Sequence, residues 1–379
     1  MNRMNNRTPR LATLALMLAA LTACTKTTIS PNDDLTNALN PSSGAPIAFE
    51  SQDAFTKADD NTDPEAFMAV RAGGFKVWSW FQGTTSGPMF GENGTVVTDA
   101  NYVADLEEGQ TMPKPNWTYS PTRYWLNGTY DFAAVYPSSV SGTYAPAEGE
   151  TTPTLTVKDF DVTNQDDLLV AFNTGIDGAG RTAEDEVEIN FQHALSCIQL
   201  RLNLKPEDFY EIDDKTNTPI LSEDHQLGYA VITKVGLRNV STTGSLMASK
   251  ESEISYDWTP STTLGNVDFV LTGSDLVSIT YSPTDCLRNG ILAIPQQILG
   301  TSGELYLEVN IDFPGVINEP IRRVYNIPLD AAGEIVPIWE ANKKYIYFGE
   351  IDQNFAIEFS VTTINKWEDN PLGGFNVVS

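Results

Sequence analysis

The sequence predicts an all-β protein built from two tandem antiparallel β-sandwiches with few short helices. Many short segments alternate apolar and polar residues, and 27 glycines and 22 prolines punctuate them. Long stretches with helical periodicity are nearly absent. The clearest strand is "ELYLEVNIDF" (304–313), in which a large apolar residue occupies every second position. A chain of 379 residues is long enough for two domains of ordinary size.

The chain begins with the pattern of a bacterial secretion signal over residues 1–23. Three arginines precede the apolar core "LATLALMLAAL" (11–21), which is too short to span a bilayer. The run ends in "LTAC", which resembles a lipobox, so we expect Cys24 to be acylated and to become the first mature residue. The alternative is an ordinary signal peptide that happens to end near a cysteine. Residues 24–45 are polar and predict a flexible tether.

The first sandwich is predicted over residues 46–210. Its first strand falls within "PIAFESQDAF" (46–55), where Ile47 and Phe49 share one face. One or two helical turns are expected in "DPEAFMAVRA" (63–72), with Asp63 as the cap and proline at the first helical position. Further strands are expected at the following stretches: "GFKVWSWF" (74–81), "YDFAAVYP" (130–137) and "LTVKDF" (155–160).

The longest alternating run of this half is "DEVEINFQHALSCIQLRLNL" (185–204). Its apolar residues keep one phase from Val187 to Leu195 and the opposite phase from Ile198 onward. A strand cannot exchange its faces without an extra residue, so the pattern predicts a bulge or break near Ser196–Cys197.

The second sandwich, with a C-terminal tail strand, is predicted over residues 211–379. The acidic, turn-rich segment 205–228 marks the boundary between the halves. Beyond it, strands are expected at these stretches: "VITKVGLRNV" (231–240), "VDFVLTG" (267–273), the run at 304–313, "KKYIYFGEI" (343–351) and "FAIEFSVTTINKW" (355–367).

The charge is strongly negative and excludes one class of partner. The formal net charge is −27, and it becomes −30 once residues 1–23 and their three arginines are removed. A nucleic-acid-binding protein needs a basic surface to neutralise phosphates, so no nucleic-acid partner is expected. No other segment is long and apolar enough to span a membrane, which leaves a lipid as the anchor.

No catalytic motif rises above background in this chain. It has no G-x-S-x-G, H-E-x-x-H, phosphate-binding glycine loop or C-x-x-C, and only two histidines. The sequence therefore predicts no enzyme, no metal site and no cofactor. Beyond Cys24 only Cys197 and Cys286 remain. They could pair across the halves, but two cysteines are no disulfide framework, and small buried apolar side chains are favoured.

The stretch "NWTYSPTRYWLNGTYDFAAVYP" (116–137) carries seven aromatic residues, and two interpretations follow from the residues alone. In one, exposed rings stack on a glycan, as in a monomeric surface lipoprotein. In the other, Tyr130, Phe132 and Ala134 face a core, Asp131 and Ala133 face outward, and the preceding segment caps the sandwich. Aromatic side chains serve cores more often than ligands.

A third interpretation comes from a resemblance that runs through most of the mature chain. The chain resembles the fimbrillin family, the subunits of type V pili of Gram-negative anaerobes. The phrases that carry the resemblance are, in order, "LTAC", "PIAFESQDAFTKA", "GFKVWSWF", "WTYSPTRYWLNGTYDFAAVYP", "QDDLLVAF", "VEINFQHALSCIQLRL", "KVGLRNVSTTGSL", "GILAIPQQI", "NKKYIYFGEI" and "FSVTTINKWED".

The resemblance implies two transthyretin-like sandwiches and a structural role, as the stalk or tip of a surface fimbria that serves adhesion to a host or glycan ligand. Such subunits are exported as lipoproteins to the outer membrane. A protease then removes the first strand, and a strand from a neighbouring subunit fills the groove. Strand addition of this kind takes its affinity from main-chain hydrogen bonds and its register from alternate side chains.

The residues needed for this mechanism are present. Ile47 and Phe49 belong to the strand that is lost. The candidate cleavage sites are Lys57–Ala58 and Arg71–Ala72, both ahead of the strand at residue 75. At the end of the chain, Phe375 and Val377 in "GGFNVVS" are donor-strand candidates. Seven residues are short for a whole sandwich edge, so the donor could also include "FSVTTINKW" (359–367), or the subunit could lie at a tip.

Overall fold

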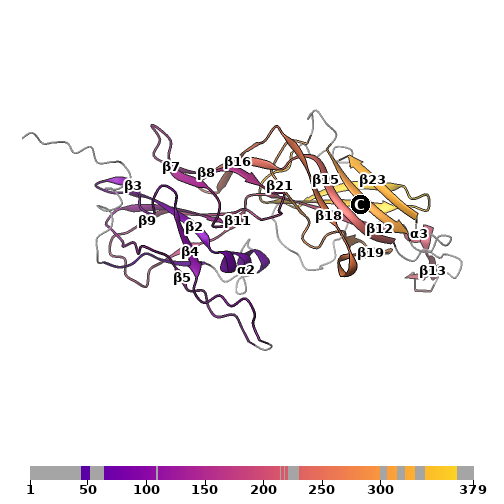
Figure 1. Cartoon of the computed structure of the whole chain (residues 1–379), viewed down its shortest axis with the longest axis horizontal. Coiled ribbons are helices and arrows are strands. Elements are labelled where there is room, and N and C mark those ends of the chain that lie inside the picture. Colours follow the sequence, from indigo (N-terminus) through magenta and orange to yellow (C-terminus); the bar gives the residue numbers. More distant parts are fainter. Residues whose placement is uncertain are drawn as a thin grey trace, which may run out of the picture.

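The computed structural model describes residues 44–51, 64–107, 110–213, 215–216, 218–220, 230–298, 305–313, 321–328 and 338–364. Within these ranges nearly all regular structure is β, as predicted. The helices are short: α2 (Pro64–Gly73), α3 (Pro206–Phe209) and a 3-10 turn (Gly273–Asp275). Figure 1 shows an elongated molecule in which a β-rich first half (purple) and a β-rich second half (orange to yellow) follow one another along the long axis.

The first half contains two large antiparallel sheets. One has seven strands, in the order β11 (Gln192–His193), β9 (Leu169–Asp177), β6 (Thr129–Tyr136), β2 (Phe75–Gln82), β4 (Thr95–Asp99) and β5 (Trp117–Thr118), with β3 (Ser86–Pro88) attached to β2. The other has four, in the order β17 (Ile254–Pro260), β16 (Thr243–Lys250), β8 (Pro153–Asp161) and β7 (Gly142–Pro146).

The seven-stranded sheet is buried on both faces, so this half has three layers. One face packs on the four-stranded sheet through Trp78, Val135 and Leu155. The other face carries a second core that also includes residues of α2, of β1 (Ala48–Ser51) and of β10 (Glu186–Ile189). The expectation that Asp131 and Ala133 face outward is therefore wrong, because the four-stranded sheet covers that side and leaves them 9% and 0% exposed.

The second half is a sandwich of two five-stranded sheets. The first contains β20 (Thr284–Asp285), β12 (Ser196–Leu204), β24 (Lys343–Ile351) and β25 (Ile357–Ile364), with β21 (Ile291–Ala293) on β12. The second contains β18 (Leu264–Val270), β15 (Ala230–Ser241), β22 (Tyr306–Phe313) and β23 (Ile321–Pro328), with β19 (Val277–Ile279) on β15. A small pair, β13 (Glu211–Asp213) and β14 (Thr218–Ile220), lies apart from them.

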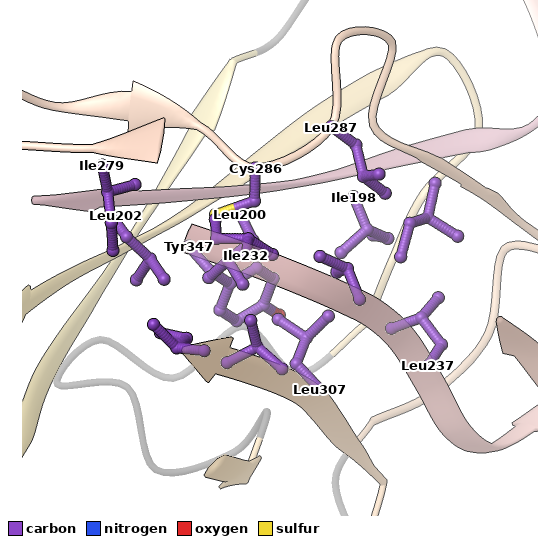
Figure 2. Packing of buried hydrophobic residues seen from close by; sticks show 14 of the residues in the cluster. Ile198, Leu200, Leu202, Ile232, Leu237, Ile279, Cys286, Leu287, Leu307 and Tyr347 are labelled. Atoms are coloured by element: carbon purple, nitrogen blue, oxygen red, sulfur yellow. The ribbon is translucent and has the colours of Figure 1, made fainter. Parts of the chain in front are cut away.

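Figure 2 shows part of the core between these two sheets, to which Leu200 and Leu202 of β12 and Ile232 and Leu237 of β15 all belong. The alternation expected for residues 304–313 is confirmed, because every second side chain of β22 is buried. Cys197 and Cys286 do not pair in a disulfide, and both side chains are buried.

The long run 185–204 is divided among three sheets. β10 pairs with β1, β11 belongs to the seven-stranded sheet, and β12 belongs to the second half. The break expected from the change of phase is confirmed, and it falls at residues 194–195, just before β12. This is the point at which the chain leaves the first half, so the two phases of the sequence serve two different cores.

The strand pairing crosses the boundary that the sequence suggests. β12 precedes residue 210 but lies in a sheet of the second half. β16 and β17 follow residue 211, but β16 pairs with β8 of the first half and β17 pairs with β16. A single residue separates β15 from β16, so one ribbon passes from the sheet of one half into the sheet of the other. Each half therefore contains strands from the other side of the predicted boundary, and the chain passes between the halves more than once.

Candidate functional site

The first strand lies in a slot of which β10 forms one wall. β1 pairs with β10 in parallel, from Ala48 opposite Glu186 to Ser51 opposite Ile189. These two strands form a sheet of their own, and none of the larger sheets includes β1. The expected first strand at 46–55 is therefore present over the residues that the structure describes.

The other wall of the slot is a segment of the aromatic stretch. The N–H of Ile47 donates to the carbonyl of Arg123 at 2.8 Å, and the N–H of Trp125 donates to the carbonyl of Ala45 at 2.9 Å. Pro46 forms an antiparallel bridge with Tyr124 between these two bonds. The leading segment thus has main-chain partners on both sides, like an interior strand of a sheet.

Two side chains of this segment are buried in the aromatic core. Ile47 is 2% exposed and Phe49 is 3% exposed. The Phe49 ring lies within van der Waals reach of four others, with centroid distances to Phe75 (6.2 Å), Phe90 (5.7 Å), Tyr119 (5.5 Å) and Phe132 (6.1 Å). Edge-to-face and tilted pairs of this kind add to the stability gained from buried area. The residues expected on the core face of the first strand are both in the core.

Tyr119 fixes the strand from within the slot. Its hydroxyl donates to the carbonyl of Ile47 at 2.7 Å and accepts the N–H of Arg123 at 3.2 Å. Burial raises the pKa of Tyr119 to about 12. The phenol therefore stays protonated, and remains a hydrogen-bond donor, throughout the physiological range.

The aromatic stretch 116–137 forms part of this core and offers no exposed stacking face. Trp117, Trp125, Tyr130 and Phe132 are 9%, 7%, 0% and 0% exposed. The remaining three rings of the stretch are half-buried. Stacking on a glycan requires rings that open to solvent, so the core interpretation describes these residues better than the ligand interpretation.

The candidate cleavage site Arg71–Ala72 lies in the last turn of α2, and Arg71 is buried at 3% exposure. Its Nε donates to Oδ2 of Asp99 at 2.6 Å, and its Nη2 donates to the carbonyl of Pro113 at 2.7 Å. Oδ1 of Asp99 accepts two main-chain N–H groups at 2.9 Å, from Asn101 and Asn116. Cleavage at Arg71 would require α2 to open first, because a protease binds an extended, exposed segment.

The other predicted site residues lie outside the described part of the chain. These are Cys24, Lys57, Ala58, Phe375 and Val377. The sequence did not reveal the walls of the slot, β10 and residues 123–125, or the part that Tyr119 plays. Long-range pairing has no local signal, although the density of rings in 116–137 did indicate a core.

The architecture defines an all-β protein with two sandwiches and a leading strand that belongs to none of the large sheets. A fimbrillin-like family profile matches residues 58–367, which is most of the chain. The chain belongs to the fimbrillin-like family. The family expected from the sequence phrases is thereby confirmed.

One solved structure supports this fold, and a second is a more distant match. A fimbrial protein from Bacteroides vulgatus superposes with a TM-score of 0.51 at 13% identity, covering 85% of this chain and 99% of that one. The tip fimbrial protein Mfa3 from Porphyromonas gingivalis, with a C-terminal truncation, gives a TM-score of 0.35 at 9% identity, covering 78% and 95%. No curated protein sequence matches. Among the described residues, no helix has the length and apolar character needed to cross a membrane.

Proposed function

We propose that the protein is a structural, non-enzymatic subunit, stalk or tip, of a surface fimbria that serves adhesion. It is exported as a lipoprotein acylated at Cys24, held at the outer membrane, trimmed by a protease and polymerised by strand exchange with other subunits. The observation that carries this proposal is the slot of β1. Both sides of the leading segment are hydrogen-bonded and its apolar side chains are buried, yet its loss leaves every large sheet complete.

Removal of the leading strand would leave a site that can bind a strand from another chain. It would expose the aromatic pocket around Phe49 and free the main-chain groups of β10 and of residues 123–125. Unpaired main-chain groups beside an apolar groove favour the addition of a strand from another chain. The family membership supports the same role, because fimbrial subunits assemble with one another.

Two cleavage sites are candidates for the trimming step, Lys57–Ala58 and Arg71–Ala72. Both follow β1 in sequence, so either cut releases it. The burial of Arg71 and its bond to Asp99 favour Lys57 in the folded precursor. The donor strand comes from the C-terminal part of a neighbour, for which Phe375 and Val377 are candidates.

The test is to treat the purified full chain with a lysine-specific protease and to follow product and assembly together. We expect a discrete body that begins at Ala58 and converts to a ladder of polymers in gel electrophoresis without boiling. Mass spectrometry of the surface-displayed protein should give the same start. Digestion throughout the chain, or a trimmed body that stays monomeric at high concentration, would contradict the proposal. A surface-displayed protein that begins at an acylated Cys24 would identify an anchor or a plain lipoprotein instead.

A further inference from the structure

One sheet of the second half has an outer face that combines exposed apolar side chains with balanced charge. The sheet contains β18, β15, β22 and β23. Its other face packs in the core of this half, through side chains such as Val235 and Leu237 of β15 and Val309 of β22. Because side chains alternate along a strand, the residues between these positions point away from the core. They form the outer face of this sheet.

Two valines on the outer face are the most exposed large apolar side chains among the described residues. Val270 of β18 is 70% exposed, and Val324 of β23 is 57% exposed. Val270 pairs with Lys234 of β15, and Val324 pairs with Asn310 of β22. Lys234 and Asn310 pair with each other, so all four residues form one row across the sheet. An exposed valine therefore lies at each end of the row.

The charged side chains in the middle of this face are paired with one another. Nζ of Lys234 lies 2.8 Å from Oε1 of Glu308 and 3.1 Å from Oδ1 of Asp268. Nη2 of Arg238 lies 2.5 Å and 3.0 Å from Oδ1 of Asp268 and Oε1 of Glu308. Gly236 lies beneath this cluster, where a Cβ would come within 2.8 Å of Oδ1 of Asp268. The glycine therefore leaves room for the ion pairs.

A further pair completes the charge balance of the face. Nε and Nη2 of Arg322 donate to the two carboxylate oxygens of Asp312 at 2.7 Å and 2.9 Å. Hydrogen bonds from Arg238 and Lys234 hold the pKa of Glu308 below its ordinary value, and Arg322 does the same for Asp312. Three cations and three ionised acids thus cancel on the described part of this face.

The balance matters because the whole chain carries a formal net charge of −27. Copies of so acidic a protein repel one another in most orientations. A neutral face is where two copies approach at a low electrostatic cost. Exposed apolar side chains on the same face then supply an attraction, since contact between them removes apolar surface from water.

The outer face is also complementary to itself. A two-fold axis parallel to the strands, midway between two such faces, reverses the order of the four strands in the second copy. β18 of one copy then lies over β23 of the other, and β15 lies over β22. Val270 of each copy contacts Val324 of the other, so both exposed valines are covered at once. Face-to-face sheets with nearly aligned strands are a common packing arrangement.

We propose that the outer face of this sheet binds the same face of a second copy of the chain about such an axis. The face measures roughly 19 by 23 Å, from four strands of about seven residues each. Two such faces bury roughly 900 Å² in total, which is less than the area of most stable complexes. A single contact is therefore weak, and it becomes lasting where many copies are held in a row, as in a filament.

This contact goes beyond the proposed function and does not depend on it. It uses neither β1 nor its slot, and the chain need not be trimmed. In a fimbria built from this protein, the contact joins neighbouring filaments side by side. In the untrimmed chain it gives a weak dimer.

The experiment mixes two full-length variants, Val270→Cys and Val324→Cys, under mild oxidation. Both also carry Cys24→Ser, so that the buried Cys197 and Cys286 are the only other cysteines. Contacting positions lie within disulfide distance, and a linked dimer is expected from the mixture. Either variant alone should link far less, because like positions lie about 14 Å apart across the strands.

The matched control replaces one partner by Met247→Cys. Met247 is 47% exposed on the outer face of the four-stranded sheet of the first half, so it reports chance collisions. A link between positions 270 and 324 well above this control supports the inference. Equal links from every combination, a preferred link to position 247, or no link at all overturns it. The polymers expected from trimming are unaffected by any of these results.

A second measurement needs no cross-link. Sedimentation equilibrium at high concentration should show weak self-association of the parent chain. Val270→Lys and Val324→Glu should each weaken it several-fold, whereas Met247→Lys should not. Mixing the Val270→Lys and Val324→Glu chains should restore association, because the new charges then meet across the contact. A parent chain that stays monomeric, or a mixture no stronger than its components, overturns the inference.

Discussion

At the scale of the residue, one aromatic side chain of the leading strand lies deep in the core of the first half. Phe49 contributes a ring to a cluster with Phe75, Phe90, Tyr119 and Phe132, and it is almost wholly buried. Its neighbour Glu50 is exposed, so the two residues offer a matched comparison between the core face and the solvent face of the same strand.

We predict that Phe49→Ala lowers the free energy of unfolding of the full-length precursor by about 3–5 kcal/mol, because it leaves a cavity among packed rings. Glu50→Ala should change it by less than about 0.5 kcal/mol. Denaturant unfolding of both variants measures the difference. Fibres made from trimmed chains should be equally stable for Phe49→Ala and the parent, since residue 49 is removed. A weaker fibre would mean that the strand is retained.

The second prediction concerns the buried pair of Arg71 and Asp99. Asp99→Asn leaves Arg71 without its charged partner, which for a buried pair costs about 3–5 kcal/mol of stability. α2 should then open more often, and an arginine-specific protease should cut after Arg71 much faster than in the parent chain. N-terminal sequencing of the product identifies the cut.

The control for this pair is Lys114→Met, which removes the exposed ion pair with Glu50 and should change neither stability nor cleavage measurably. Rapid cleavage after Arg71 in the parent chain would show that α2 does not protect it.

At the scale of the element, alternation along single strands was predictable and pairing between distant strands was not. Buried side chains at every second position of β22 follow directly from its sequence, as does the break before β12. The sequence did not indicate that β16 and β17 belong to the first half, because their alternation of apolar and polar residues fits either core. The expectation that Asp131 and Ala133 of β6 face outward was wrong for the same reason. The sequence of a strand does not show that a second sheet covers its other face.

Trp258 lies on β17, in the hairpin of β16 and β17 that follows the predicted boundary in sequence but belongs to the first half. Its indole N–H donates to the carbonyl of Ala194, at 2.8 Å, where the chain passes between the halves. We predict that Trp258→Ala costs about 3 kcal/mol and splits a single thermal transition into two, because it weakens the core of the first half where the chain passes to the second, so that the two halves no longer unfold together. The neighbouring exposed Asp257→Ala should leave one transition. Calorimetry distinguishes the two cases, and a single unshifted transition in Trp258→Ala would contradict the coupling.

At the scale of the whole molecule, the net negative charge opposes the strand exchange that we propose for the slot of β1. The full chain carries a formal net charge of −27, so copies of it repel one another. The proposed strand exchange therefore depends on main-chain bonds and buried rings strong enough to overcome this repulsion.

We predict that polymers of the trimmed chain form several-fold faster when ionic strength rises from about 0.02 M to about 0.2 M, because the screening length shortens from tens of ångströms to roughly the width of a strand pair. Light scattering follows the rate. Glu186→Lys should reduce this dependence and speed assembly at low salt. Slower assembly at high salt would mean that attraction between opposite charges, and not strand insertion, brings the copies together.

The ribbon formed by β15 and β16 has a mechanical consequence for any filament made of this protein. Because one continuous ribbon is hydrogen-bonded into the sheets of both halves, we expect a subunit to be rigid at the junction between them. Bending under fluid drag is then confined to the joints between subunits. Electron micrographs of such filaments would show straight rods, each one molecule long, that meet at variable angles.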